Sequence, residues 1–141
     1  MKTKLISIIS LVALTLTILA SCTVPTGDNA SVWDNATYSE DTALGTGDTT
    51  FTLVVEAESK TVTFTVSTNE ENVGAALLSL NLIAGEDSAY GLYVKTVNGI
   101  LADYDIDGSY WAFYIDGDYA MTGVDSTVAV SGSSYALKRE K

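Results

Sequence analysis

Histidine is absent from this 141-residue chain, cysteine occurs once, at Cys22, and proline once, at Pro25. Without an imidazole the chain cannot form a Ser–His–Asp triad, a Cys–His pair or a histidine metal site. A single cysteine leaves no partner for an internal disulfide, so a packed core must stabilise the fold. These absences predict a protein that is not an enzyme and requires no cofactor.

Basic side chains are scarce as well. Seven Lys and Arg stand against 18 Asp and Glu, which gives a formal net charge of −11 at pH 7. A surface this acidic repels phosphate backbones, which argues against nucleic acid as a partner. The charge otherwise indicates an acidic coat that keeps the protein soluble.

The N-terminus has the pattern of an export signal. Lys2 and Lys4 precede an almost wholly apolar run over residues 5–20, which is too short and wrongly flanked for a membrane-spanning helix. The sequence Leu-Ala-Ser-Cys at 19–22 resembles the bacterial lipobox, whose cysteine is acylated and becomes the new N-terminus. We therefore expect residues 1–21 to be a lipoprotein signal peptide and Cys22 to be lipidated. Loss of Lys2 and Lys4 would move the formal charge from −11 to −13.

Lipidation of Cys22 would make the mature protein extracytoplasmic, with the membrane as a partner through the lipid. The next residues, up to 48, contain Pro25, three glycines and few apolar side chains. This composition is typical of a flexible chain. We expect residues 22–48 to be a tether, in which Trp33 and Tyr38 either dock on the domain or are solvated, and residues 49–141 to be one folded domain.

For the first half of that domain the sequence predicts a hairpin followed by a helix. Apolar residues alternate with polar ones over 51–57 and again over 61–67, which predicts two antiparallel strands. The spacing then changes to that of a helix over 73–83, with Asn72 as N-cap and Gly85 as terminator.

The second half returns to strands, predicted at 91–97, 110–115, 119–121, 127–130 and 134–138. Asn-Gly at 98–99 and Asp-Gly at 116–117 are strong hairpin turns. A single core suits a domain of this size. The fold class expected is α+β, a β-grasp-like mixed sheet with one helix packed on it.

Aromatic residues are concentrated between 90 and 119. Strand alternation puts Tyr110 on one face and Trp111 on the other. Tyrosine and tryptophan dominate recognition surfaces, so we expect Tyr90, Tyr93 and Tyr110 to offer stacking surface to a planar or glycan ligand. For Trp111 both a core position and a ligand contact stay open.

Asp103, Asp105 and Asp107, followed by Gly108, have the spacing found at the start of a calcium-binding loop. The twelfth position of such a loop falls on Tyr114, which removes the bidentate carboxylate. We therefore interpret this segment as a solvated acidic loop, and we keep the three aspartates as a weak candidate for a metal site. No other metal site is expected.

Several segments, in order, resemble the C-terminal β-domain of the transcobalamin and intrinsic factor family. They are the helix at 73–78, the strand and turn at 90–99, the Tyr-Trp strand and hairpin at 108–117, and Thr-Gly-Val-Asp at 122–125. Ser-Gly-Ser at 131–133 departs from the acidic turn that this family usually has before its last strand. The resemblance implies a transcobalamin C-terminal-like domain over 49–141.

In the eukaryotic carriers this domain closes over cobalamin that a large helical domain holds, and no such domain fits in this chain. By position, the resemblance places ligand-facing residues at Tyr90, Tyr93, Ala120 and Thr122. The function it implies is a membrane-anchored binding lipoprotein that takes up cobalamin or a related small ligand. A membrane transporter or a second binding chain would be its partner. The alternative is a cell-surface adhesive or structural module that binds a protein, peptide or glycan.

Overall fold

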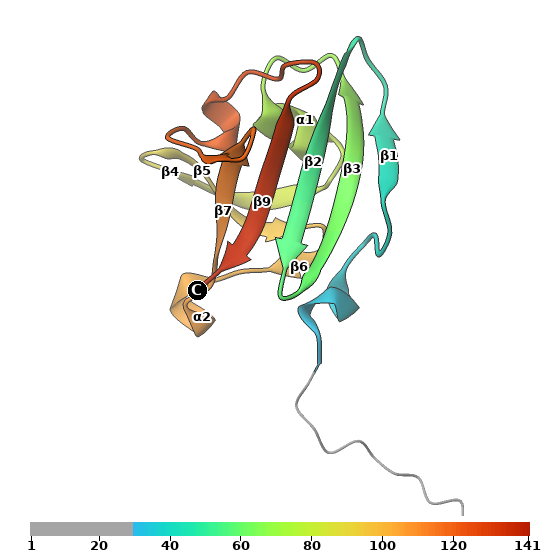
Figure 1. Cartoon of the computed structure of the whole chain (residues 1–141). Coiled ribbons are helices and arrows are strands. Elements are labelled where there is room, and N and C mark those ends of the chain that lie inside the picture. The colour runs from blue at the N-terminus through green and yellow to red at the C-terminus, as the bar shows by residue number, and fades with distance from the viewer. Residues whose placement is uncertain (1–29) are drawn as a thin grey trace, which may run out of the picture.

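The computed structural model describes residues 30–141, so the expected signal peptide and Cys22 lie outside the described residues. The larger of its two sheets is mixed and has six strands in the order β1-β3-β2-β9-β7-β8 (Figure 1). In that order the strands are Thr42–Gly45, Lys60–Thr68, Thr49–Ala57, Ser134–Glu140, Tyr110–Ile115 and Asp118–Tyr119. The α+β class and the mixed sheet expected from the sequence are confirmed.

A second sheet of three strands, in the order β4-β5-β6, packs on the inner face of the first. Its strands are Ile83–Ser88, Gly91–Val97 and Ile100–Leu101. The helices are short: η1 Val32–Asn35, α1 Val73–Ser79, α2 Tyr104–Asp107 and η2 Val124–Ser126. Within residues 30–141, none of them has the length and apolar character needed to cross a membrane.

The β2–β3 hairpin forms as predicted, with Phe51 opposite Val66 and Val55 opposite Val62. The apolar residues of both strands other than Val54 are buried, whereas most of the residues between them are partly or fully exposed. Period-two alternation therefore buries one face only. Tyr135 of β9 joins this core, with its ring 5.1 Å from that of Phe51.

Helix α1 begins where the sequence predicts and ends earlier. The side chain of Asn72 accepts a hydrogen bond from the amide of Ala75 at 2.7 Å, as an N-cap does. Asn81 then takes a left-handed φ of 55°, which a helix cannot continue through. The chain enters β4 at Ile83, so the expected terminator Gly85 lies instead within a strand, at an irregularity in its pairing with β5.

Residues 30–48 correct the expected extent of the tether. Trp33 is only 9% exposed, and its indole N–H donates to the carbonyl oxygen of Ala57 at 2.8 Å. Strand β1 pairs in parallel with β3. A buried indole and a strand ladder fix this N-terminal segment to the domain.

The strand expected at 127–130 does not form. Val128 makes one isolated bridge to Asn72, and the segment otherwise passes irregularly beside the start of α1. Strand β9 is already paired with β2 on one side and β7 on the other. Residues 127–130 therefore have no free edge of β9 to pair with, although their apolar residues alternate as in a strand.

Candidate functional site

The β4–β5 hairpin presents two of the expected ligand-facing tyrosines. Tyr90 sits at its turn with 96% of its surface exposed, and Tyr93, on β5, is also exposed. Ser88 tightens the turn, since its Oγ donates to the carbonyl oxygen of Gly91 at 2.6 Å. The same Oγ accepts a hydrogen bond from the amide of Tyr90 at 3.2 Å.

Asp125 holds this hairpin against η2. Its Oδ2 accepts a hydrogen bond from the amide of Leu92 at 3.0 Å. Gly91 is needed for this approach, because a Cβ at that position would lie 2.8 Å from Oδ2 and φ there is +99°. Oδ1 of Asp125 is buried and has no hydrogen-bond partner among residues 30–141. Asp125 belongs to the Thr-Gly-Val-Asp segment noted in the sequence, but its contact with the hairpin was not predicted.

The segment that precedes η2 brings the other two expected residues to the same place. The amide of Ala120 donates to the carbonyl oxygen of Phe113 at 2.9 Å, and its side chain packs against the core. Thr122 is exposed, with its hydroxyl 2.9 Å from that of Thr127. Met121, between them, is 94% exposed.

We call the surface formed by Tyr90, Tyr93, Met121 and Thr122 the hairpin edge. Gly91 and Gly123 both lie directly against the Asp125 carboxylate, so the two segments of the edge meet there. Tyr90, which precedes Gly91, and Thr122, which precedes Gly123, therefore lie on the two segments that meet at Asp125. The edge thus exposes two tyrosine rings, a thioether and a threonine side chain with which a ligand could make contact.

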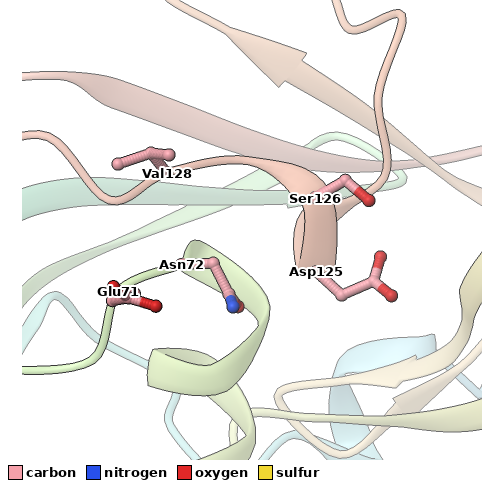
Figure 2. A pocket seen from close by; sticks show the side chains of 5 residues that line it. All are labelled: Glu71, Asn72, Asp125, Ser126 and Val128. Atoms are coloured by element: carbon pink, nitrogen blue, oxygen red, sulfur yellow. The ribbon is translucent and has the colours of Figure 1, made fainter.

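A shallow pocket of about 290 Å³ borders the same aspartate. Figure 2 shows its lining residues, Glu71, Asn72, Asp125, Ser126 and Val128. The carboxylate of Asp125 points away from Glu71 and Asn72 in this view, so the carboxylates do not converge on one point. The pocket can add polar contacts beside the hairpin edge.

Tyr110 lies elsewhere, in a cluster on the outer face of the six-stranded sheet. The hydroxyls of Tyr110 and Tyr114 donate to the two carboxylate oxygens of Glu140, at 3.2 and 2.7 Å. Tyr119 packs edge-on against Tyr114, with ring centroids 5.4 Å apart. We call Tyr110, Tyr114 and Tyr119 the tyrosine cluster.

Glu140 changes the acidity of the cluster. The hydrogen bond between the neutral Tyr114 hydroxyl and the Glu140 carboxylate raises the pKa of Tyr114 to about 12, and burial of the ring and the negative charge of Glu140 act in the same direction. The same causes, in the same order, raise the pKa of Tyr110. Both rings therefore stay neutral donors at physiological pH.

Trp111 is buried on the inner face of β7. Its indole N–H donates to the carbonyl oxygen of Lys95 on β5, at 3.2 Å, so β5 adjoins the Trp111 face of β7 and not the Tyr110 face. The expected surface of Tyr90, Tyr93 and Tyr110 is therefore divided between two sites. Of the two interpretations of Trp111, the structure supports the core position.

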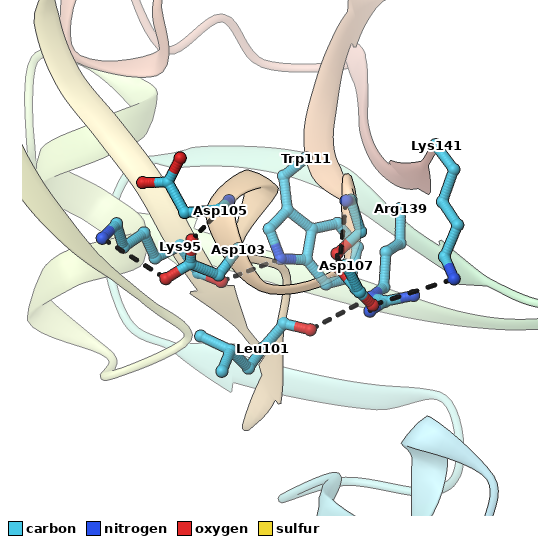
Figure 3. A network of polar contacts seen from close by, with 9 residues as sticks. Lys95, Leu101, Asp103, Asp105, Asp107, Trp111, Arg139 and Lys141 are labelled. Atoms are coloured by element: carbon cyan, nitrogen blue, oxygen red, sulfur yellow. Dashed lines mark hydrogen bonds and ion pairs between the residues drawn. The ribbon is translucent and has the colours of Figure 1, made fainter.

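The three aspartates of the calcium-like spacing are used separately (Figure 3). Asp103 caps α2 by accepting from the amide of Asp105 at 3.0 Å, and it lies 3.6 Å from the Lys95 ammonium. Asp107 accepts from the guanidinium of Arg139 at 2.8 Å and from both the amide and the hydroxyl of Ser109.

Hydrogen bonds from Ser109, and then the Arg139 contact, lower the pKa of Asp107 to about 2. A short helix occupies the loop that would have to wrap around a cation. No group of three potential metal ligands gathers anywhere in residues 30–141. The aspartates thus act as a helix cap and ion-pair partners in this fold.

Comparison with solved structures identifies the fold class first. The chain matches a proposed metal-binding protein from Ruminococcus gnavus ATCC 29149 with a TM-score of 0.63 and 27% identity, over 67% of this chain and 98% of that one. It also matches haptocorrin, in a structure of its complex with Cbi, with a TM-score of 0.54 and 19% identity. That match covers 70% of this chain and 26% of haptocorrin, so the chain spans about a quarter of that carrier's length.

The matched part of haptocorrin, a transcobalamin-family protein, is its C-terminal region. The resemblance inferred from the sequence is confirmed: this chain has the fold of the transcobalamin-type C-terminal domain. Both structural neighbours are binding proteins rather than enzymes. No family model matches the chain, and no curated protein matches it.

Proposed function

We propose that this protein is an extracytoplasmic lipoprotein that binds a small ligand of the corrinoid class at its hairpin edge. One observation carries the proposal: the Leu92–Asp125 hydrogen bond joins the hairpin that bears Tyr90 to the segment that bears Thr122. The domain of haptocorrin that shares the fold belongs to a protein bound to Cbi. Fold alone does not fix function, so the proposal depends on the edge.

The chemistry of the edge suits a large, partly apolar ligand. Tyr90 and Met121 expose nearly their whole side chains, and a rigid aromatic ring gains contact area at low entropic cost. The hydrogen bond that Ser88 donates to Gly91 and the one that Asp125 accepts from Leu92 fix the hairpin before any ligand arrives, which reduces the cost of ordering it. A second chain or a transporter would supply the opposite wall.

Anchoring by Cys22 is the second part of the proposal. The apolar run over 5–20 and the small residues before Cys22 support it. A lipid there would hold the domain at the membrane surface, where a captured ligand could be passed to an uptake system. Mass spectrometry of the membrane-extracted protein checks this directly, as an acylated cysteine adds the mass of its lipid.

Calorimetric titration of the mature chain carrying Cys22→Ser, with cyanocobalamin and with cobinamide, tests ligand binding. We expect saturable heat for at least one of them. Tyr90→Ala should weaken that binding about tenfold, the effect of losing one well-packed aromatic contact. Tyr104→Ala removes an exposed tyrosine of α2, away from the edge, and is the control. Absence of heat with both corrinoids would contradict a corrinoid ligand.

The tyrosine cluster favours a second candidate function. Its three rings lie on the open face of the sheet, with two hydroxyls already oriented by Glu140. Such a platform suits binding of a glycan or a peptide by a cell-surface module. Glycan or peptide binding that Tyr119→Ala abolishes and Tyr90→Ala preserves would favour this function over the first.

A further inference from the structure

The six-stranded sheet is covered on one face only. Figure 1 shows α1 and the three-stranded sheet behind it, and the core lies on that side. No helix or strand of residues 30–141 packs against the other face, where the side chains that alternate with the core residues of β2 and β3 are partly or fully exposed. We call the surface formed by the outward residues of β3, β2, β9, β7 and β8 the open face.

The strand register arranges the open face in rows that run across the strands. One row crosses all five strands, and its successive cross-strand partners are Thr63, Val54, Ala136, Tyr114 and Tyr119. Partners in a ladder project to the same side of a sheet. The row therefore connects the outward threonines of β3 to the tyrosine cluster.

The next row contains only hydroxyl side chains. Thr65 of β3 lies opposite Thr52 of β2, and Thr52 lies opposite Ser134 of β9. Rows on one face of a strand are about 7 Å apart and neighbouring strands about 4.8 Å apart, so these groups and Thr63 form a regular pattern. We call Thr52, Thr63, Thr65 and Ser134 the hydroxyl array.

The threonines of the hydroxyl array are free to bind. In the row beyond them, Thr50 and Ser67 satisfy each other, with their hydroxyl oxygens 3.0 Å apart. The hydroxyls of Thr52, Thr63 and Thr65 make no such bond to another group of residues 30–141. Threonine is restricted at χ1 because it is β-branched. Its hydroxyl therefore loses little freedom when it bonds a ligand.

The hydroxyl array contains no ionisable side chain, although the whole chain has a formal charge of −11. At its border, Glu56 pairs with Lys138 at 3.6 Å, while Asp41 and Asp116 accept hydrogen bonds from backbone amides at 2.8 Å. An anionic partner is repelled by this protein, and a cationic one finds more carboxylates elsewhere on its surface. The charge distribution therefore favours an uncharged partner on the open face.

A second copy of the chain suits the open face less well than a hydroxylated ligand does. The centre of a stable dimer interface is mostly apolar, whereas the rows described above have only Val54 and Ala136 between the hydroxyls and the tyrosines. Hydroxyl groups that are buried without a hydrogen-bond partner also cost free energy. A sugar supplies both donors and acceptors to such groups.

Tyr119 adds an accessible aromatic ring at the end of the first row. It is 58% exposed. The ammonium of Lys138 already lies over the Tyr114 ring, 4.8 Å from its centroid, so Tyr119 is the ring of this row that is left for a ligand. A tyrosine ring offers a broad apolar face, on which the C–H groups of a sugar ring can pack.

We propose that the open face binds an uncharged, extended polysaccharide, which lies across the hydroxyl array with one sugar ring against Tyr119. A repeating polymer makes several weak contacts at once with a repeating array, and the contacts add up along it. The inference rests on the second candidate function, binding at the tyrosine cluster, and is independent of the corrinoid site at the hairpin edge.

Affinity electrophoresis of the mature chain carrying Cys22→Ser tests the proposal. Native gels contain one of four neutral polymers, namely hydroxyethylcellulose, arabinoxylan, galactomannan or amylopectin, or the acidic polymer polygalacturonate. We expect at least one neutral polymer to retard the protein and polygalacturonate to leave its mobility unchanged. Normal mobility in all four neutral gels, or equal retardation by polygalacturonate, would overturn the proposal.

The hydroxyl array is tested by replacing Thr52 and Thr65 together. Valine keeps the β-branched shape and removes both hydroxyls, so Thr52→Val with Thr65→Val should weaken binding about tenfold, the effect of losing two hydrogen bonds. Serine at both positions keeps the hydroxyls and should preserve binding. The matched control is Thr46→Val with Thr96→Val, because these two threonines lie outside the open face, after β1 and on β5. It should bind as the wild type does.

The remaining outcomes separate this site from the other proposals. Binding that Tyr119→Ala abolishes and the valines at 52 and 65 leave unchanged would keep the second candidate function and overturn the role of the array. A wild-type dimer in sedimentation that Thr65→Lys converts to a monomer would assign the open face to a second copy and overturn the proposal. Corrinoid titration of the same variants reports on the hairpin edge alone.

Discussion

The side chain of Asn98 pairs with both backbone polar groups of Tyr38, sixty residues earlier in the chain. The Tyr38 amide donates to Asn98 Oδ1 at 2.9 Å, and Asn98 Nδ2 donates to the Tyr38 carbonyl oxygen at 2.8 Å. Asn98 is fully buried and has a positive φ of 51°. The side-chain amide of Asn98 thus makes the pair of backbone hydrogen bonds that a neighbouring strand would make with Tyr38.

Replacing Asn98 by Ala should destabilise the domain by about 2 kcal/mol, since the mutation leaves a buried donor and acceptor of Tyr38 unpaired. Chemical denaturation measures the free energy of unfolding. Asn81→Ala is the control, as Asn81 has a similar φ of 55° but is exposed. If both variants lose the same stability, the cost lies in the backbone conformation and not in the pairing with Tyr38.

Replacing Trp33 by Ala should cost about 3 kcal/mol, the usual effect of removing a large buried aromatic side chain. Trp33→Phe keeps most of the apolar contact but leaves the Ala57 carbonyl oxygen without its donor, and it should cost about 1 kcal/mol. The free energies of unfolding of the two variants check this order. An unchanged stability in Trp33→Ala would show that the buried indole does not stabilise the fold.

Stability should fall as the pH rises from about 10 to 12. Both unfolded tyrosines ionise near their ordinary pKa, whereas the Glu140 hydrogen bond raises the pKa of Tyr110 and takes that of Tyr114 to about 12. The stabilisation is therefore complete below pH 10 and is lost as the pH approaches 12. Tyrosinate absorbance should show a late-titrating group that Glu140→Gln shifts to lower pH. Persistence of that late group in Tyr114→Phe would assign it to another tyrosine.

Acid should weaken the α2 region through Asp107. Hydrogen bonds from Ser109 lower its pKa in the folded state to about 2, below the ordinary value of 3.8. Its contribution is present above pH 4 and is lost as the pH falls toward 2. The decline in stability over that range should be shallower in Asp107→Asn than in the wild type. Asp105→Asn is the control, because it removes an exposed carboxylate of the same helix that accepts no hydrogen bond within residues 30–141.

Local patterns predicted those parts of the fold that depend on neighbouring residues. Alternation of apolar and polar residues predicted strands β2, β3 and β7. The Asn-Gly and Asp-Gly pairs predicted two hairpin turns, and Asn98 and Asp116 in these turns have the positive φ that such turns require. The N-cap at Asn72 was predictable for the same reason. Each signal lies within a few residues of the structure that it specifies.

Long-range contacts explain what the sequence did not reveal. Residues 30–48 have the composition of a tether, yet Trp33 and Tyr38 are fixed by Ala57 and Asn98, which are distant in sequence. The division of the tyrosines between two surfaces depends on which face of β7 receives β5. Asp125 and Glu140 organise those surfaces. Asp125 lies in the Thr-Gly-Val-Asp segment that carries the family resemblance, but neither its contact with Leu92 nor the contact of Glu140 with two tyrosines could be inferred from spacing.

Gly91 offers a way to test whether the hairpin edge must be preorganised. A Cβ there would lie 2.8 Å from the Asp125 carboxylate, whereas a Cβ at Gly117 would meet nothing within 4 Å. The two glycines have nearly the same φ, +99° and +92°, so Ala at either position carries a similar backbone strain of about 1 kcal/mol. Only Gly91→Ala also displaces Asp125 from Leu92.

We therefore expect Gly91→Ala to lose more stability than Gly117→Ala and to weaken corrinoid binding, while Gly117→Ala binds as the wild type does. Calorimetric titration and denaturation of both variants measure the two effects separately. Equal binding by both variants, at unequal stability, would mean that the Leu92–Asp125 hydrogen bond supports the fold without positioning Tyr90 for a ligand. The proposed site would then have to lie elsewhere, and the tyrosine cluster around Glu140 would be the surface to test.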